Sequence, residues 1–177
     1  GVWTTMTPGS FTVTNGGLTF PGLLTSGNAV TTAIQGSQWN YSLRPTNFSW
    51  GGAGTTTWAQ YLIRPESGYG QWGTFVLGGS FMTANTVQFG LGTQGGDRYL
   101  FIQQGNTGTP QKALYNWQPG HTYFVQGKLA VDGAGNANMT AYLWADNSGP
   151  VTSVSYNLPS WIGSSTWIQL YSSGGYT

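Results

Sequence analysis

The chain of 177 residues is long enough for one domain with its own core, carries a net charge of +1, and has no Cys for disulfides or thiolate metal sites. Only 5% of its residues are charged and 15% are aromatic, against about 25% charged residues in an average soluble domain. Because phosphate neutralisation needs clustered cations, this composition argues against nucleic acid as a partner, and no segment approaches the roughly 18 apolar residues of a membrane span.

The first clear strand pattern is the alternation over residues 58–64. Alternation places Trp58, Gln60 and Arg64 on one face. A glycine-rich loop follows at residues 68–73, and we expect its aromatic side chains, Tyr69 and Trp72, to form the rim of a groove.

Two further strands are predicted in the middle of the chain, at residues 87–91 and 98–103. In the first, alternation places Val87, Phe89 and Leu91 on the same side. In the second, Tyr99 and Phe101 oppose Leu100 and Ile102. Each strand therefore has one face suited to a core.

The longest predicted strand covers residues 122–132 and ends in an Asp-Gly turn signal, which tolerates the positive φ of a tight hairpin. We therefore expect residues 123–131 to pair with residues 139–144. Gln126 and Lys128 share one face of the long strand.

The last predicted strand covers residues 166–172 and has Trp167, Gln169 and Tyr171 on one face. No window has a helical period, and glycine-rich turn signals recur about every 8 to 12 residues. The pattern predicts an all-β fold, a two-sheet antiparallel β-sandwich.

Three segments resemble bacterial concanavalin A-like (laminin-G-like) domains: residues 18–28, 57–64 and 121–129. The resemblance implies a jelly roll, and the length predicts a single domain over residues 1–177. The resemblance also implies that the family's first and last strands are lacking here. A gap at that place would leave unpaired strand edges, so we expect flanking strands or a neighbouring subunit to complete the sheet.

Catalytic chemistry finds little support in the sequence. Its four carboxylates are Glu66, Asp97, Asp132 and Asp146. Glycoside hydrolysis generally needs two carboxylates across the scissile bond, and the resemblance implies acids two residues apart on one strand, a spacing that none of these has. His121 has no second imidazole with which to form a zinc site. We therefore expect no catalytic residue and no enzyme.

Calcium is a separate expectation, because domains of the resembling family often bind it through loop oxygens. Calcium prefers six to eight oxygen ligands, several of them carboxylates. With acids this scattered, only a structural site rich in carbonyl oxygens is conceivable. Asp132 and Asn136 form the best local pair, and the alternative is a plain hairpin turn.

The tryptophans divide between core and surface. We assign Trp3, Trp39 and Trp144 to the core, since a two-sheet core needs large rings. Trp117 lies between Asn116 and Gln118 before a Pro-Gly turn, and we expect it to be exposed.

Together these patterns predict a non-catalytic, extracellular or cell-surface module that binds a neutral polysaccharide or other glycan. Sugar rings pack on aromatic faces, and their hydroxyls need amide or charged partners. We expect the polar and aromatic faces to form one groove: Trp58, Gln60, Arg64, Tyr69, Trp72, Gln126, Lys128, Trp167, Gln169 and Tyr171. Two alternatives stay open: a structural surface, matrix or filament subunit that assembles through open sheet edges, and a carbohydrate-active enzyme with unusual residues.

Overall fold

The computed structural model describes residues 4–5, 11–24, 27–32, 40–66, 72–78, 86–105, 108–159, 161 and 165–173. These residues contain strands and no helix, so none of their segments is a helix able to cross a membrane. The strands are β1 (Thr4–Thr5), β2 (Phe11–Thr14), β3 (Ala29–Thr32), β4 (Asn40–Trp50), β5 (Thr56–Ile63), β6 (Trp72–Leu77), β7 (Val87–Gln94), β8 (Asp97–Gln104), β9 (Gln111–Leu114), β10 (Tyr123–Val131), β11 (Ala137–Trp144), β12 (Thr152–Leu158) and β13 (Ser165–Ser173). The all-β prediction is confirmed.

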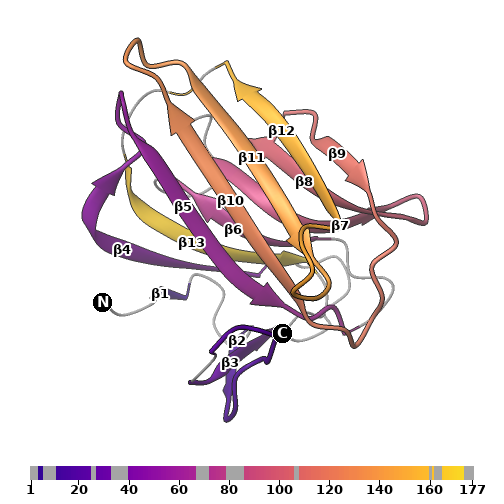
Figure 1. Cartoon of the computed structure of the whole chain (residues 1–177). Helices are drawn as coiled ribbons and strands as arrows, with labels where there is room; N and C mark the ends of the chain where they lie inside the picture. Colours follow the sequence, from indigo (N-terminus) through magenta and orange to yellow (C-terminus); the bar gives the residue numbers. More distant parts are fainter. Residues whose placement is uncertain are drawn as a thin grey trace.

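Two antiparallel sheets pack face to face in a sandwich-like arrangement (Figure 1). The larger sheet has seven strands in the order β1-β4-β13-β6-β7-β8-β9, and the smaller has four in the order β12-β11-β10-β5. β2 and β3 form a separate two-stranded hairpin. The chain passes from one sheet to the other between β4 and β5, and again between β5 and β6, β9 and β10, and β12 and β13.

The hairpin predicted from the Asp-Gly signal is confirmed in its pairing. β10 and β11 pair antiparallel, with Phe124 opposite Trp144 and Val131 opposite Ala137. β10 also pairs with β5, where Lys128 lies opposite Trp58 and Gln126 opposite Gln60. The register therefore brings predicted site residues from two strands side by side.

The core lies between the two sheets and is built from the alternation predicted above. Val87, Phe89 and Leu91 of β7 are fully buried there. The smaller sheet contributes its own inward side chains: Val125, Leu129, Met139, Ala141 and Leu143. Gly127 lies in the middle of β10 because a Cβ there would lie 2.6 Å from Cζ of Phe89. Close packing thus explains a glycine inside a strand, where glycine otherwise weakens pairing.

Two tryptophan assignments are wrong. Trp117 is 0% exposed in the core, although both of its sequence neighbours are exposed. The Arg98 guanidinium lies 5.0 Å from the centre of the Trp117 ring and donates a hydrogen bond of 2.6 Å to the Trp117 carbonyl. Trp144 is only half-buried, on the side of β11 that points away from the core. Trp3 and Trp39 lie outside the described residues.

The connection between β4 and β5 is fixed by a second tryptophan contact. Trp161 packs against Trp50 with ring centres 5.8 Å apart, and its Nε1 donates a 2.9 Å hydrogen bond to the Gly51 carbonyl. Gly51 has φ 76°, and a Cβ there would press against the Trp161 ring, so this turn requires glycine. The turn thus fixes how β4 leads into β5, across from one sheet to the other.

Candidate functional site

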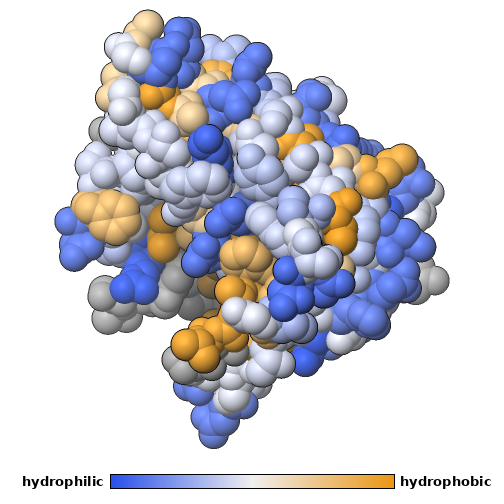
Figure 2. Space-filling model, in the orientation of Figure 1, coloured by the Kyte–Doolittle hydropathy of each residue, from blue (hydrophilic) through white to orange (hydrophobic). Residues whose placement is uncertain are grey.

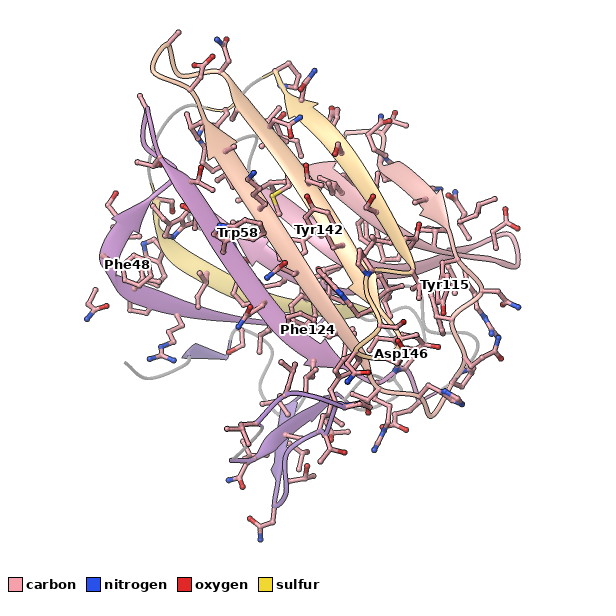
Figure 3. The ribbon with its side chains drawn as sticks, viewed as in Figure 1. Phe48, Trp58, Tyr115, Phe124, Tyr142 and Asp146 are labelled. Atoms are coloured by element: carbon pink, nitrogen blue, oxygen red, sulfur yellow. The ribbon has the colours of Figure 1, made fainter. Side chains whose placement is uncertain are left out.

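The outer face of the four-stranded sheet gathers amide, hydroxyl and aromatic side chains (Figure 3). Odd-numbered residues of β10 and β11 point into the core, so their even-numbered residues point outward. With the register, this gives three open cross-strand rows: Trp58–Lys128–Thr140–Ser155, Gln60–Gln126–Tyr142–Ser153, and Thr56–Ala130–Asn138–Asn157. We call these three rows the outer face.

The polar side chains of the outer face are held by one another. Asn138 Nδ2 donates to Asn157 Oδ1 at 2.8 Å, and the hydroxyls of Thr140 and Ser155 lie 2.9 Å apart. Gln126 Nε2 approaches Gln60 Oε1 at 3.4 Å. These contacts fix the amide planes on a rigid strand surface while leaving donors and acceptors directed to solvent.

Aromatic rings complete the outer face at two places. The Trp58 side chain is 53% exposed, and the Lys128 ammonium lies 5.5 Å from its ring centre. Tyr142 packs beside Trp144, with ring centres 5.8 Å apart. Beyond them, Phe20 packs against Phe124 at 5.9 Å and covers the end of the sheet toward the β2–β3 hairpin. Figure 2 shows this side as mostly polar, with scattered apolar patches.

A cleft of about 610 Å³ opens beside Trp58, between β5 and β4. Its floor is apolar and comes from both sheets: Ala59, Phe75, Leu77 and Ile168. Its rim carries Arg44, Asn47 and Gln60, together with two exposed rings, Trp58 and Phe48. Figure 3 shows Phe48 and Trp58 on opposite sides of this opening, and Figure 2 shows the surface hollowed there.

β4 forms one wall of the cleft and has a β-bulge there. Trp50 pairs with Ser165 and Pro45 with Trp167, so residues 46–49 stand against the single residue Thr166. The Thr46 hydroxyl donates a 2.7 Å hydrogen bond to the Phe48 carbonyl inside the bulge. Bulges redirect side chains and occur near functional sites, and here the Phe48 side chain is 60% exposed at the rim.

Four predicted site residues come together at the junction of the outer face and the cleft: Trp58, Gln60, Gln126 and Lys128. Arg64 follows β5 and is held by Glu66, with Nη2 and Oε1 2.8 Å apart. Tyr69 lies outside the described residues.

The prediction of one common groove is wrong for the remaining residues, because they belong to the seven-stranded sheet. Gln169 is 0% exposed and Tyr171 is buried in β13. Trp72 is half-buried in β6 and packs on Phe101 with ring centres 4.5 Å apart. Trp167 is 38% exposed on the same face of β13 as Gln169. Period-two alternation groups residues along one strand but does not say which sheet the strand joins.

Buried amides on that sheet satisfy one another instead of facing solvent. Thr74 Oγ1 donates to Gln88 Oε1 at 3.2 Å, and Gln88 Nε2 donates to Gln103 Oε1 at 2.7 Å. Gln103 Nε2 donates to the Gly108 carbonyl at 2.5 Å. A glutamine that alternates with hydrophobic residues therefore has two outcomes. In the seven-stranded sheet it joins a buried chain of hydrogen-bonded amides, and in the four-stranded sheet it lies on an open surface.

The Asp132–Asn136 pair closes the β10–β11 turn. Asp132 Oδ1 accepts hydrogen bonds from the backbone N–H groups of Ala134 and Asn136, and Oδ2 accepts one of 2.8 Å from Asn136 Nδ2. With these three hydrogen bonds, the Asp132 carboxylate closes the turn without a bound cation. The described residues contain no group of three or more His, Cys, Asp or Glu side chains that could hold a metal ion.

This turn predicts a pH effect. Hydrogen bonds from the Asn136 side chain, and then from its backbone, hold the pKa of Asp132 below its ordinary value. The ionised turn therefore stabilises the fold above the ordinary carboxyl pKa, and this contribution is lost as pH falls through the lowered pKa. We expect Asn136→Ala to raise the pKa of Asp132, measured by NMR titration. The difference in the free energy of unfolding between wild type and Asn136→Ala should become smaller in acid. A difference that does not change with pH would contradict this prediction.

The remaining acids are also in structural contacts or turns. Glu66 pairs with Arg64, and Asp146 accepts hydrogen bonds from the backbone and hydroxyl of Ser148, at 2.8 and 2.6 Å. Asp97 begins β8 opposite Gln94. Asp132 and Asp146 thus lie in turns, Asp97 begins β8 and Glu66 follows β5, and none of the four lines the cleft.

Sequence reasoning missed Phe48 and most of the outer face on β11 and β12. The omitted residues are Asn138, Thr140, Tyr142, Ser153, Ser155 and Asn157. Alternation along residues 137–144 was a usable signal for the β11 residues. Phe48 had no such signal, because its position depends on a bulge.

No protein-family model matches the chain, and no curated protein matches its sequence. Among solved structures, it is similar to the crystal structure of a protein of unknown function from Shewanella oneidensis MR-1, with a TM-score of 0.48 and 10% sequence identity. The match covers 98% of this chain and 77% of that chain.

Proposed function

We propose that the chain is a non-catalytic glycan-binding module on a concanavalin A-like jelly roll, and part of an exported or cell-surface protein. The observation that carries the proposal is the cluster of Trp58, Gln60, Gln126 and Lys128 where the outer face meets the cleft. An exposed ring stands there beside fixed amides and opposite a second exposed ring, Phe48.

This combination matches the chemistry of a sugar. One face of a pyranose presents C–H groups, which pack on an aromatic ring, and its edges present hydroxyls, which need donors and acceptors in a plane. Strands hold the ring and the amides in place before a ligand arrives, and less conformational entropy is therefore lost on binding. The rows of Asn, Thr, Ser and Gln side chains extend the polar surface beyond one sugar unit, which suits a polysaccharide.

Self-assembly is the second candidate function, and one observation favours it. β5 pairs with β10 on one side and, in the described part of the chain, has no strand on the other. Such an edge can accept a strand from a neighbouring subunit or a flanking segment. A strand added at this edge would fill the same cleft as the proposed glycan. Experiment can therefore separate the two functions by asking which of the two binds.

Affinity electrophoresis through gels containing single polysaccharides tests the proposal. We expect retardation by at least one polymer, and about thirtyfold weaker binding for the double variant Gln60→Ala/Gln126→Ala, since each of the two lost hydrogen bonds is worth about 1 kcal/mol. Gln111→Ala, an exposed glutamine on β9 of the other sheet, is the matched control. No retardation, together with ordered polymers seen by light scattering and microscopy, would instead support assembly.

A further inference from the structure

We infer that the outer face binds one linear polysaccharide chain along a diagonal, from Trp58 on β5 to Tyr142 on β11, so that tight binding requires a chain of several sugar units. This inference rests on the proposed glycan-binding function and adds the path of the ligand and its minimum length. It starts from where the strand register places the aromatic rings of the outer face.

The aromatic rings of the outer face stand at two separate places. Trp58 is 53% exposed, and Tyr142 lies two strands away and one outward position further along the strands. Strand spacing and rise per residue place the Cα atoms of these two residues about 12 Å apart. Figure 3 shows both side chains on the same side of the sheet. A single sugar unit does not reach across this span, so a ligand that contacts both rings is an oligomer.

Neighbouring rings hold Tyr142 in place. Trp144 lies beside it with ring centres 5.8 Å apart, and Phe124 packs on Trp144 with ring centres 5.1 Å apart. All three side chains point outward and are half-buried, so each keeps part of its ring at the surface. Rings fixed in this way form a rigid surface on which the C–H face of a sugar can pack.

Open amides lie between the two ring sites. The diagonal crosses β10 between Gln126 and Lys128. The contact from Gln126 Nε2 to Gln60 Oε1 is 3.4 Å long, beyond the usual range of an N–H···O hydrogen bond. These two side chains therefore keep most of their donors and acceptors for sugar hydroxyls. The order of ring, amides and ring along the diagonal suits a chain of sugars, which presents C–H faces and hydroxyl edges.

The row on the other side of Trp58 lacks both features. It consists of Thr56, Ala130, Asn138 and Asn157, and it contains no aromatic residue. Its amides also satisfy each other, because Asn138 Nδ2 donates to Asn157 Oδ1 at 2.8 Å and Asn138 Oδ1 accepts from the Thr140 hydroxyl at 3.3 Å. The bound chain therefore leaves Trp58 toward Tyr142 and not toward Asn157.

An oligosaccharide series tests the minimum length. Oligomers of one to eight sugar units would be prepared from the polysaccharide that retards the protein, and calorimetry would measure the affinity and stoichiometry of each. We expect affinity to rise about tenfold between oligomers that reach one ring site and oligomers that reach both, and then to level off. One long oligomer should bind per protein. A monosaccharide that binds as tightly as the longest oligomer, or two long oligomers bound at once, would overturn the inference.

Tyr142→Thr tests the path, because it removes the ring and leaves a residue suited to a strand. It should weaken binding of the longest oligomer about tenfold and leave unchanged the affinity of the shortest oligomer that binds measurably. That unchanged affinity would also show that the variant is folded. Tyr142→Phe should keep most of the affinity for the longest oligomer. Asn157→Ala, in the row on the other side of Trp58, is the matched control and should change neither affinity.

The outcomes distinguish the two proposals. An equal loss for short and long oligomers in Tyr142→Thr would overturn the inferred path and leave glycan binding intact. A loss for the longest oligomer in Asn157→Ala, with none in Tyr142→Thr, would also overturn it, because the chain would then run in the opposite direction. Failure of the parent polysaccharide and of every oligomer to bind would overturn the proposed function itself, and the inference with it.

Discussion

Replacement of Trp58 by alanine should weaken polysaccharide binding about thirtyfold and leave the fold intact. Trp58 is 53% exposed, belongs to the outer face, lines the cleft, and is not a member of the buried core cluster. Exposed tryptophans at the centre of a binding surface commonly account for about 2 kcal/mol or more, and 1.4 kcal/mol corresponds to a factor of ten in affinity. Isothermal titration calorimetry with the retarding polysaccharide would measure the loss.

The chain offers a matched control for this prediction. Trp167 is the same residue type and is 38% exposed, but it lies on the seven-stranded sheet and does not line the cleft. Trp167→Ala should leave the affinity unchanged, whereas Trp58→Phe should retain part of it, since a smaller ring still stacks. Equal losses in Trp58→Ala and Trp167→Ala would place the ligand elsewhere or indicate a general loss of structure, which thermal melts would reveal.

The local pattern of the sequence was sufficient to predict β5, β7, β8, β10, β11 and β13. Alternation identified the inward residues Val87, Phe89 and Leu91, and the Asp-Gly signal identified the hairpin that joins β10 and β11. Both features depend on residues close in sequence, where side-chain period and turn chemistry decide the conformation. The pairing of Gln60 with Gln126 was not predicted; it is seen in the structure because β5 and β10 are neighbours in the same sheet.

Sheet membership could not be predicted in the same way. β13 around Gln169 resembles β5 around Gln60, since each strand has a tryptophan, an aliphatic residue and a glutamine in succession. However, β13 lies between β4 and β6 inside the larger sheet, whereas β5 is an edge strand of the smaller one. Strand order arises from long-range pairing, which a single strand's composition does not encode.

Phe48 shows a second limit of sequence reasoning. Its exposure results from the mismatch of residues 46–49 with Thr166, which lies more than a hundred positions further along the chain. Nothing in the residues around Phe48 signals a bulge, because a bulge is a property of two strands together. The cleft could therefore not be predicted from the sequence, although Trp58, one of its lining residues, was predicted as a binding residue.

Trp117 is the residue whose replacement should most reduce stability. The sequence placed it at the surface because both of its neighbours are polar, but those neighbours are exposed while the Trp117 ring turns inward. The ring joins the core cluster beneath Arg98, and the carbonyl of the same residue accepts the Arg98 hydrogen bond. Trp117 thus links the β9–β10 connection, in which it lies, to the core.

Trp117→Ala should lower the free energy of unfolding by about 3–5 kcal/mol, the usual cost of emptying a buried aromatic site. Urea denaturation would measure this as a lower midpoint with an unchanged slope. Trp117→Phe should cost far less, because a ring still fills the site and the buried indole Nε1, which has no hydrogen-bond partner among the described residues, is removed. A loss of unfolding free energy below about 1 kcal/mol in Trp117→Ala would mean that the ring is not buried, because substitutions of exposed residues usually have effects of that size or smaller.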